Sequence, residues 1–239
     1  MAFKAFLATV AFAGAIVLAP AVASAFTVSY QNSGNVFGTN GHSNVYINSA
    51  ANPVVTALHV SAGGFALKGD LDGNSVVENF TGWCLDIVTY MGNNKNYVAT
   101  NTPFAVNPNA KILTATQIAN IGKLFNTAFN AITLTNNTDS AAFQLALWEL
   151  AYETAPTYTL ALGNFTATNS TSAIARANTL LAGLNGPTVG KAWNLTFLQS
   201  TPHNSQNLVT ATPVPLPAAG LMLLAALGGL GLARRRCTA

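Results

Sequence analysis

Two stretches decide how the middle of the chain folds: Ala142-Phe143-Gln144-Leu145-Ala146-Leu147-Trp148-Glu149 and the earlier Gly82-Trp83-Cys84-Leu85-Asp86. In the first, the uncharged amide of Gln144 interrupts an apolar run. In the second, Cys84 follows the bulky Trp83. Burying an amide without partners costs about 1–3 kcal/mol, so Gln144 needs hydrogen-bond partners or a chemical reason for its position.

The apolar run belongs to the second of three predicted helices. Apolar residues at helical spacing predict helices over 114–129 and 170–184, and an N-cap followed by an apolar run predicts another helix over 139–153. Thr114 and Gln117 fit a capping box, and Asp139 is a good N-cap for the second helix. On that helix Gln144 and Trp148 share one face, because they are four residues apart.

Strands are predicted on both sides of the helices. Alternating or β-branched segments separated by Gly, Asn and Ser predict strands over 26–30, 45–47, 54–60, 76–90, 193–198 and 208–211. The fold class is therefore α+β, a mainly antiparallel β domain, sandwich or barrel-like, with a helical insertion between about Thr114 and Asn185.

The segment from Gly69 to Asn74 resembles a calcium-binding loop in its acidic and glycine residues. Thr81 stands where the closing glutamate of an EF-hand loop is required. We therefore predict a tight hairpin turn here, and no metal or other cofactor is expected anywhere in the chain.

The N-terminus is typical of a secretion signal covering residues 1–25. Lys4 supplies a positive charge, an apolar run follows, and Ala23-Ser24-Ala25 fits a signal-peptidase site before Phe26. The alternative, a transmembrane anchor, requires a longer apolar run than this one, which ends at Pro20.

The C-terminal segment, residues 212–239, has three parts. A proline-containing linker precedes an apolar stretch from Ala218 to Ala233, which is followed by Arg234, Arg235 and Arg236. As a helix the stretch reaches ~24 Å, slightly less than the hydrocarbon core of a membrane. The arginines favour a cytoplasmic position for this end, which leaves residues 26–211 outside.

This order of parts resembles the PEP-CTERM sorting tail of Gram-negative bacteria, with Val214, Pro215, Leu216, Pro217 and Ala218 matching its VPLPA variant. The resemblance implies that an exosortase, a membrane protease, recognises and removes the tail. It implies an inner-membrane-anchored precursor and then a cell-surface or extracellular-matrix protein. A permanent tail anchor is the alternative.

The composition excludes a nucleic-acid-binding function. Four of the ten basic residues lie in the two targeting segments, so the middle of the chain holds six against all seven acidic residues. No basic patch is present in the sequence. Only 7% of the residues are charged, so Asn, Thr, Ser and Gly are expected on the surface.

Cys84 has no partner cysteine in the predicted mature domain, since Cys237 lies beyond the arginines. Exported proteins usually pair their cysteines. A lone exported thiol is buried and inert, joined to another molecule, or used chemically.

The two opening stretches resemble the thioester domains of Gram-positive surface adhesins. Cys84-Leu85-Asp86 matches a C-x-D-type segment, and Phe143 to Trp148 matches a T-Q-x-A-I-W-type segment, with Phe143 in place of the threonine. The resemblance covers Gly82 to Tyr152, less than a third of the chain. Thr116-Gln117-Ile118-Ala119 is a rival match, but no tryptophan follows it and Gln117 already has a capping role.

This resemblance implies an internal thioester between Cys84 and Gln144, formed with loss of ammonia. We expect Trp83, Phe143 and Trp148 to shield it from water and Asp86 to support the site through hydrogen bonds. An amine- or hydroxyl-bearing surface or matrix target would then be captured in a single reaction without turnover.

Two other classes of function stay open. A passive structural protein of the extracellular matrix, exported by the same route, needs no thioester. A hydrolase needs a base beside its nucleophile, and the sequence offers only isolated histidines such as His59 for a dyad with Cys84. We therefore predict that the protein is not an enzyme.

Overall fold

The computed structural model describes residues 25–32, 34–51, 54–104, 112–154, 157–186 and 190–215. Within them lie the strands β1 (Phe26–Tyr30), β2 (His42–Ala50), β3 (Val55–Gly63), β4 (Phe65–Gly69), β5 (Glu78–Cys84), β6 (Lys95–Thr100), β7 (Thr166–Thr168), β8 (Trp193–Ser200) and β9 (Leu208–Pro213). The helices are α1 (Ala115–Ala128), α2 (Asn137–Tyr152) and α3 (Thr171–Ala182), with short 3-10 turns η1 (Phe129–Ala131) and η2 (Gly183–Asn185).

Six strands close into an antiparallel barrel in the order β1-β4-β5-β9-β8-β6. The pairing of β5 with β9 joins strands from before and after the helices, and it confirms the predicted mainly antiparallel α+β fold. Closure pairs both edges of every barrel strand, which leaves no free edge in this sheet.

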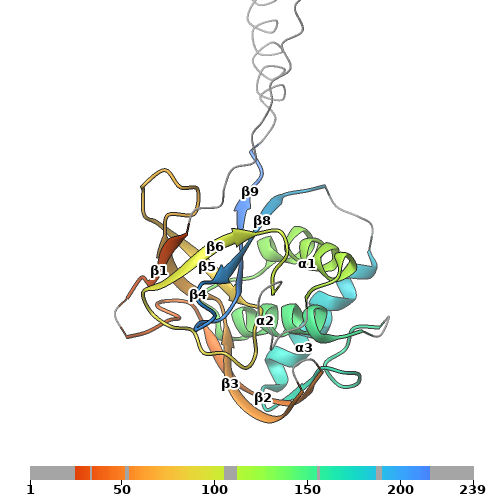
Figure 1. The fold of residues 1–239 in the computed structure, drawn as a ribbon. Coiled ribbons are helices and arrows are strands. Elements are labelled where there is room, and N and C mark those ends of the chain that lie inside the picture. Colours follow the sequence, from red (N-terminus) through yellow and green to blue (C-terminus); the bar gives the residue numbers. More distant parts are fainter. Residues whose placement is uncertain are drawn as a thin grey trace, which may run out of the picture.

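The remaining strands form a smaller sheet in the order β3-β2-β7. β7 lies inside the helical insertion and pairs with β2, so it ties the insertion to the N-terminal part of the chain. Figure 1 shows the three helices on one side of the barrel, with β2 and β3 running below α2. β4, β6 and β7 were not predicted as separate strands.

The start of α1 agrees with its predicted capping box. Thr114 Oγ1 accepts from the backbone N–H of Gln117, and the Gln117 side chain reaches back to the N–H of Thr114. The Gln117 amide also donates to the Ala151 carbonyl at 2.7 Å. The side chain of Gln117 is therefore hydrogen-bonded at the start of α1, away from Cys84.

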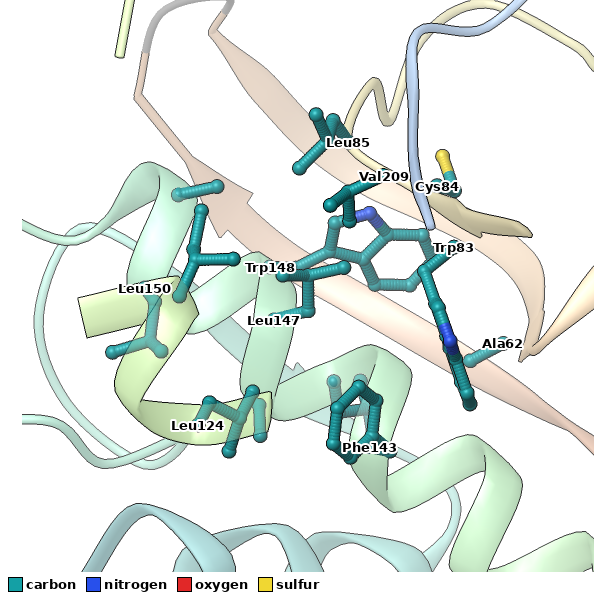
Figure 2. Close-up of a cluster of buried hydrophobic side chains, with 14 of the residues drawn as sticks. Ala62, Trp83, Cys84, Leu85, Leu124, Phe143, Leu147, Trp148, Leu150 and Val209 are labelled. Atoms are coloured by element: carbon teal, nitrogen blue, oxygen red, sulfur yellow. The ribbon is translucent and has the colours of Figure 1, made fainter. Parts of the chain in front are cut away.

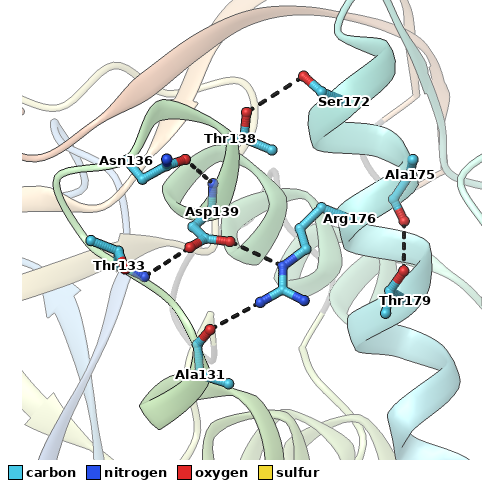
Figure 3. Close-up of polar contacts among 9 residues, drawn as sticks. All are labelled: Ala131, Thr133, Asn136, Thr138, Asp139, Ser172, Ala175, Arg176 and Thr179. Atoms are coloured by element: carbon cyan, nitrogen blue, oxygen red, sulfur yellow. Dashed lines mark hydrogen bonds and ion pairs between the residues drawn. The ribbon is translucent and has the colours of Figure 1, made fainter.

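The predicted N-cap of α2 is wrong. The capping residue is Asn136, whose side chain accepts from the N–H of Asp139 at 3.0 Å. The Asp139 carboxylate instead accepts from Thr133 N and from Arg176 Nε, both at 3.0 Å (Figure 3). Asn and Asp are comparable caps, and here Asp139 joins the start of α2 to α3.

α2 is the central helix of the domain, and every residue from Ser140 to Tyr152 is buried. α3, α1 and the β2–β3 hairpin all pack against it. A helix that is apolar on all sides is one that other elements surround, which explains why the run around Gln144 shows little helical periodicity.

The segment after Gly69 connects β4 to β5 in an antiparallel hairpin, although its loop, residues 70–77, is longer than the predicted tight turn. The Asp70 carboxylate organises the loop by accepting from Asn74 N and Ser75 N at 3.0 and 2.9 Å. No group of three or more His, Cys, Asp or Glu in the described part of the chain could hold a metal ion.

The predicted targeting segments fall almost wholly outside the described residues. Residues 1–24 and 216–239, which include most of the sorting motif and the three arginines, are among those not described. In the described ranges no helix is long and apolar enough to cross a membrane. Val214, the first motif residue, donates its N–H to the Ala192 carbonyl at 2.9 Å.

Candidate functional site

Cys84 is the last residue of β5, and it pairs with Leu208 of β9. Its side chain is 1% exposed, and it is a free cysteine. The next residue, Leu85, donates its N–H to the Asn207 carbonyl, so the chain stays fastened to the barrel beyond the strand. The barrel therefore holds the thiol at a fixed place.

Both the oxygen and the nitrogen of the Gln144 side-chain amide, on α2, are hydrogen-bonded to the backbone of Cys84. Gln144 Oε1 accepts from the Cys84 N–H at 2.9 Å, and Gln144 Nε2 donates to the Cys84 carbonyl at 2.8 Å. Gln144 is 1% exposed, so both bonds lie in the interior. The structure thus brings together the two residues that the sequence analysis paired, across 60 positions of sequence.

The sulfur of Cys84 donates to the backbone carbonyl of Asp86 at 2.8 Å. Burial raises the pKa of the thiol well above its usual value, and the nearby charge of Asp86 raises it further. The hydrogen bond to the Asp86 backbone and the indole of Trp148 act in the opposite direction. The thiol is therefore protonated and neutral near pH 7.

Asp86 lies beyond the end of β5, so it does not share a strand face with Cys84. Its carboxylate accepts from Val88 N at 3.2 Å and from Thr89 Oγ1 at 2.9 Å, and burial raises its pKa. Its backbone carbonyl accepts from both Cys84 Sγ and Gln206 Nε2. Asp86 therefore orders the turn that follows the cysteine.

Another side chain of α2, that of Tyr152, also holds this turn, and the sequence analysis did not identify it. The Tyr152 hydroxyl donates to the Leu85 carbonyl at 2.9 Å and accepts from the Ile87 N–H at 3.2 Å. Burial raises the pKa of Tyr152 well above its usual value, so the hydroxyl keeps its proton. The four-residue spacing of Gln144, Trp148 and Tyr152 is a signal that could have revealed it.

A cavity of about 320 Å³ opens beside the sulfur. Cys84, Gln144 and Trp148 line it together with Val36, Phe37, His59, Val60, Ser61, Phe65, Ile87, Thr89, Tyr90, Met91 and Gln206. The indole N–H of Trp148 is buried, and no acceptor meets it with good hydrogen-bond geometry. Trp148 is thus placed as a wall of the cavity, next to the sulfur.

Trp83 and Phe143 are not among the residues that line this cavity. Their rings pack against each other in the core with centroids 4.6 Å apart, and Phe125 and Phe129 complete the cluster. Figure 2 shows the Trp83 indole and the Cys84 sulfur pointing away from each other. Trp83 and Phe143 therefore lie on the core side of the site and not on its cavity side.

His59 also lines the cavity, so the alternative of a Cys84–His59 dyad has a structural counterpart. The hydrogen bond of the thiol, however, goes to the Asp86 carbonyl rather than to an imidazole. His59 packs against Tyr46 with ring centroids 4.6 Å apart. This arrangement supplies no base bonded to the sulfur.

Comparisons with known proteins find little sequence relationship. No protein-family model matches the chain, and no curated protein matches it. Among solved structures, it is similar to the N-terminal domain of the Streptococcus pyogenes pilus tip adhesin Cpa, with 17% identity, a TM-score of 0.37, and coverage of 64% of this chain and 85% of that one.

A second similar structure is the N-terminal thioester domain of fibronectin-binding protein SfbI from Streptococcus pyogenes. The identity is 15% and the TM-score 0.40, with 80% of this chain and 94% of that chain covered. Both TM-scores are low, so the chemistry of the site is inferred from the geometry around Cys84 and Gln144 alone.

Proposed function

We propose that this is an exported surface or matrix protein that attaches covalently to its target through a thioester between Cys84 and Gln144. The observation that carries the proposal is the pair of reciprocal hydrogen bonds between the Gln144 amide and the Cys84 backbone. They fix the carboxamide carbon next to the residue that bears the nucleophile. A fixed approach of this kind replaces a slow encounter between two mobile groups.

In the first step Cys84 Sγ attacks Gln144 Cδ, the bond from Cδ to Nε2 breaks, and the thiol proton leaves with ammonia. The Cys84 N–H already donates to Oε1, so it stabilises the negative charge that develops there during the attack. The product is neutral, whereas a thiolate is disfavoured by the burial that raises the pKa of Cys84.

In the second step an amine or hydroxyl of the target attacks the same carbon. The bond from Cδ to Sγ breaks, the target becomes acylated by Gln144, and its proton passes to the sulfur. The unpartnered indole N–H of Trp148 beside the sulfur is a donor for the departing thiolate. Each molecule reacts once, because the original amide is not restored.

The export route belongs to the same proposal. A signal peptidase would release residues 1–25, and the apolar segment of the tail would hold the precursor in the inner membrane. An exosortase-like protease would then act on the motif from Val214 to Ala218, leaving the domain at the cell surface or in the matrix.

One observation favours the alternative of a passive matrix protein. The two bonds to Cys84 give both the oxygen and the nitrogen of the Gln144 amide a partner, so packing alone accounts for this buried amide. The two functions differ in one reaction, since only a thioester acylates a small amine.

Methylamine separates the two functions. Purified protein should gain a covalent methylamide at Gln144 and release a titratable thiol at Cys84, and the variants Cys84→Ala and Gln144→Ala should do neither. Gln117→Ala is the matched control, because that glutamine is buried but bonded elsewhere, and it should react like wild type. Wild-type protein that takes up no methylamine would favour the passive function.

A further inference from the structure

The cavity at Cys84 continues along the free edge of β3. In the described part of the chain β3 pairs with β2 alone, at the end of the sheet β3-β2-β7. A second cavity of about 300 Å³ adjoins the first and shares Val60, Ile87 and Tyr90 with it. Its other lining residues are Val54, Val55, Thr56, Leu58 and Val88.

These two cavities form what we call the edge groove, bounded by residues 54–61 on one side and by residues 87–91 on the other. One end reaches Cys84 and Gln144. In an antiparallel pair, alternate residues of an edge strand direct their N–H and C=O away from the partner strand, so β3 presents on this side backbone groups that pair with no other described strand.

The rim of the edge groove is apolar and exposed. Val54 is 83% exposed, Val88 42% and Tyr90 85%. None of the residues that line the two cavities is Asp, Glu, Lys or Arg. Large apolar side chains gathered around an uncharged groove are typical of a surface that binds another molecule.

We infer, on the basis of the proposed function, that the edge groove binds an extended segment of a target protein as an added strand on β3 and delivers a lysine of that segment to Gln144. The unpaired backbone of β3 selects an extended polypeptide, because its hydrogen bonds require a partner with the same spacing. Val54, Val88 and Tyr90 offer contact for alternate apolar side chains of that segment.

Burial in the groove favours a neutral nucleophile. The lining residues include no carboxylate, so burial lowers the pKa of an entering lysine and favours its reactive neutral amine, although the charge of Asp86 near Cys84 acts in the opposite direction. Its Nζ then attacks Gln144 Cδ, the bond to Cys84 Sγ breaks, and the amine proton goes to the sulfur. The product is an isopeptide bond and a free thiol.

Binding is tested separately from the reaction by using the Cys84→Ala variant of the full chain, which cannot form a thioester. The probe is a fluorescently labelled nine-residue peptide of alternating Val and Thr with a central Lys. We expect fluorescence anisotropy to detect its binding, and a peptide N-methylated on every backbone amide to bind at least about tenfold more weakly, because neither of its edges can then donate hydrogen bonds to β3.

Substitutions in the Cys84→Ala protein locate the binding surface. Val88→Asp with Tyr90→Asp should weaken peptide binding about tenfold or more. Val76→Asp with Val77→Asp is the matched control, since these two valines are 55% and 66% exposed on the loop between β4 and β5, and it should bind like the parent. Thermal unfolding checks that each variant is folded.

The outcomes are distinct from those of the proposed function. Equal binding of the methylated and unmethylated peptides, or no effect of the Val88 and Tyr90 substitutions, would overturn the edge groove even if methylamine reacts. Peptide binding without methylamine uptake would support the edge groove as a binding site and contradict the thioester. Sedimentation tests a different occupant, a second copy of this chain. If the protein forms a dimer that the Val88 and Tyr90 substitutions break, the groove binds a second copy, and the proposal of a lysine-bearing partner is overturned.

Discussion

Replacing Tyr152 by phenylalanine tests how α2 holds the turn after Cys84. The hydroxyl bridges the Leu85 carbonyl and the Ile87 N–H, and both residues are buried. Phenylalanine keeps the ring and its packing against Phe165, so the substitution removes little except these two hydrogen bonds.

The size of the effect depends on the burial of the two backbone groups. A hydrogen bond contributes about 0.5–1.5 kcal/mol net, and a buried group left without a partner costs about 1–3 kcal/mol. Partial relaxation of the turn reduces the sum, so we expect the free energy of unfolding to fall by about 1–3 kcal/mol. With an m-value of about 3 kcal/mol/M, the urea midpoint should fall by roughly 0.3–1 M.

Tryptophan fluorescence in urea measures this change, since Trp83 and Trp148 are both buried. Tyr90→Phe is the control, because Tyr90 is 85% exposed and its substitution should change stability by less than about 0.5 kcal/mol. Equal midpoints for Tyr152→Phe and wild type would refute the assigned bridge, and with it the view that α2 positions the segment from Cys84 to Ile87.

Three further predictions concern burial, shielding and topology. Burial raises the pKa of Glu149 from 4.5 to about 8, so the neutral form of this side chain is favoured in the folded protein. The free energy of unfolding should therefore be highest below pH 4.5 and decline as the pH rises toward 8. Glu149→Gln should flatten this decline, as measured by urea titrations at pH 5 and 9. Trp148→Ala should open the wall of the Cys84 cavity and speed the hydrolysis of the thioester, seen as a faster gain of one water in intact mass, whereas an unchanged rate would argue against shielding. Protease added to intact spheroplasts should digest the domain of residues 26–211, and protection would contradict its position outside the cytoplasm.

The helices could be predicted where the sequence carries local signals. The capping box of Thr114 and Gln117 fixes the start of α1 because its hydrogen bonds span only three residues. The start of α2 was misplaced because Asn136 and Asp139 are three residues apart and both suit an N-cap. Local propensity does not distinguish them, and the contact of Asp139 with Arg176 on α3 is known only from the fold.

The missed strands depend on distant pairing. β7 is only three residues long and exists because Thr166 and Thr168 pair with β2, more than a hundred positions away. β6 completes the barrel between β1 and β8, which are both distant in sequence, and β4 pairs with the distant β1 as well as with its neighbour β5. Such pairings leave little trace in a local pattern, since the same residues suit a loop equally well.

The contact between Cys84 and Gln144 was predictable, whereas the contribution of Tyr152 was not foreseen. An unpaired cysteine and an amide in an apolar run are both unusual, and each identified one member of the pair. Tyr152 carries only a weak signal, its four-residue spacing from Trp148, because a tyrosine at the end of a buried helix is ordinary. The placement of Trp83 in the core results from β5, in which neighbouring residues point to opposite faces.

The mass of the intact, unreacted protein tests the thioester most directly. After correction for any removal of the terminal segments, wild-type protein should weigh one molecule of ammonia less than its sequence. Cys84→Ala and Gln144→Ala should each have their full sequence mass. A wild-type mass equal to that of the sequence, together with one freely titrating thiol at Cys84 after unfolding, would contradict covalent attachment through Cys84 and Gln144.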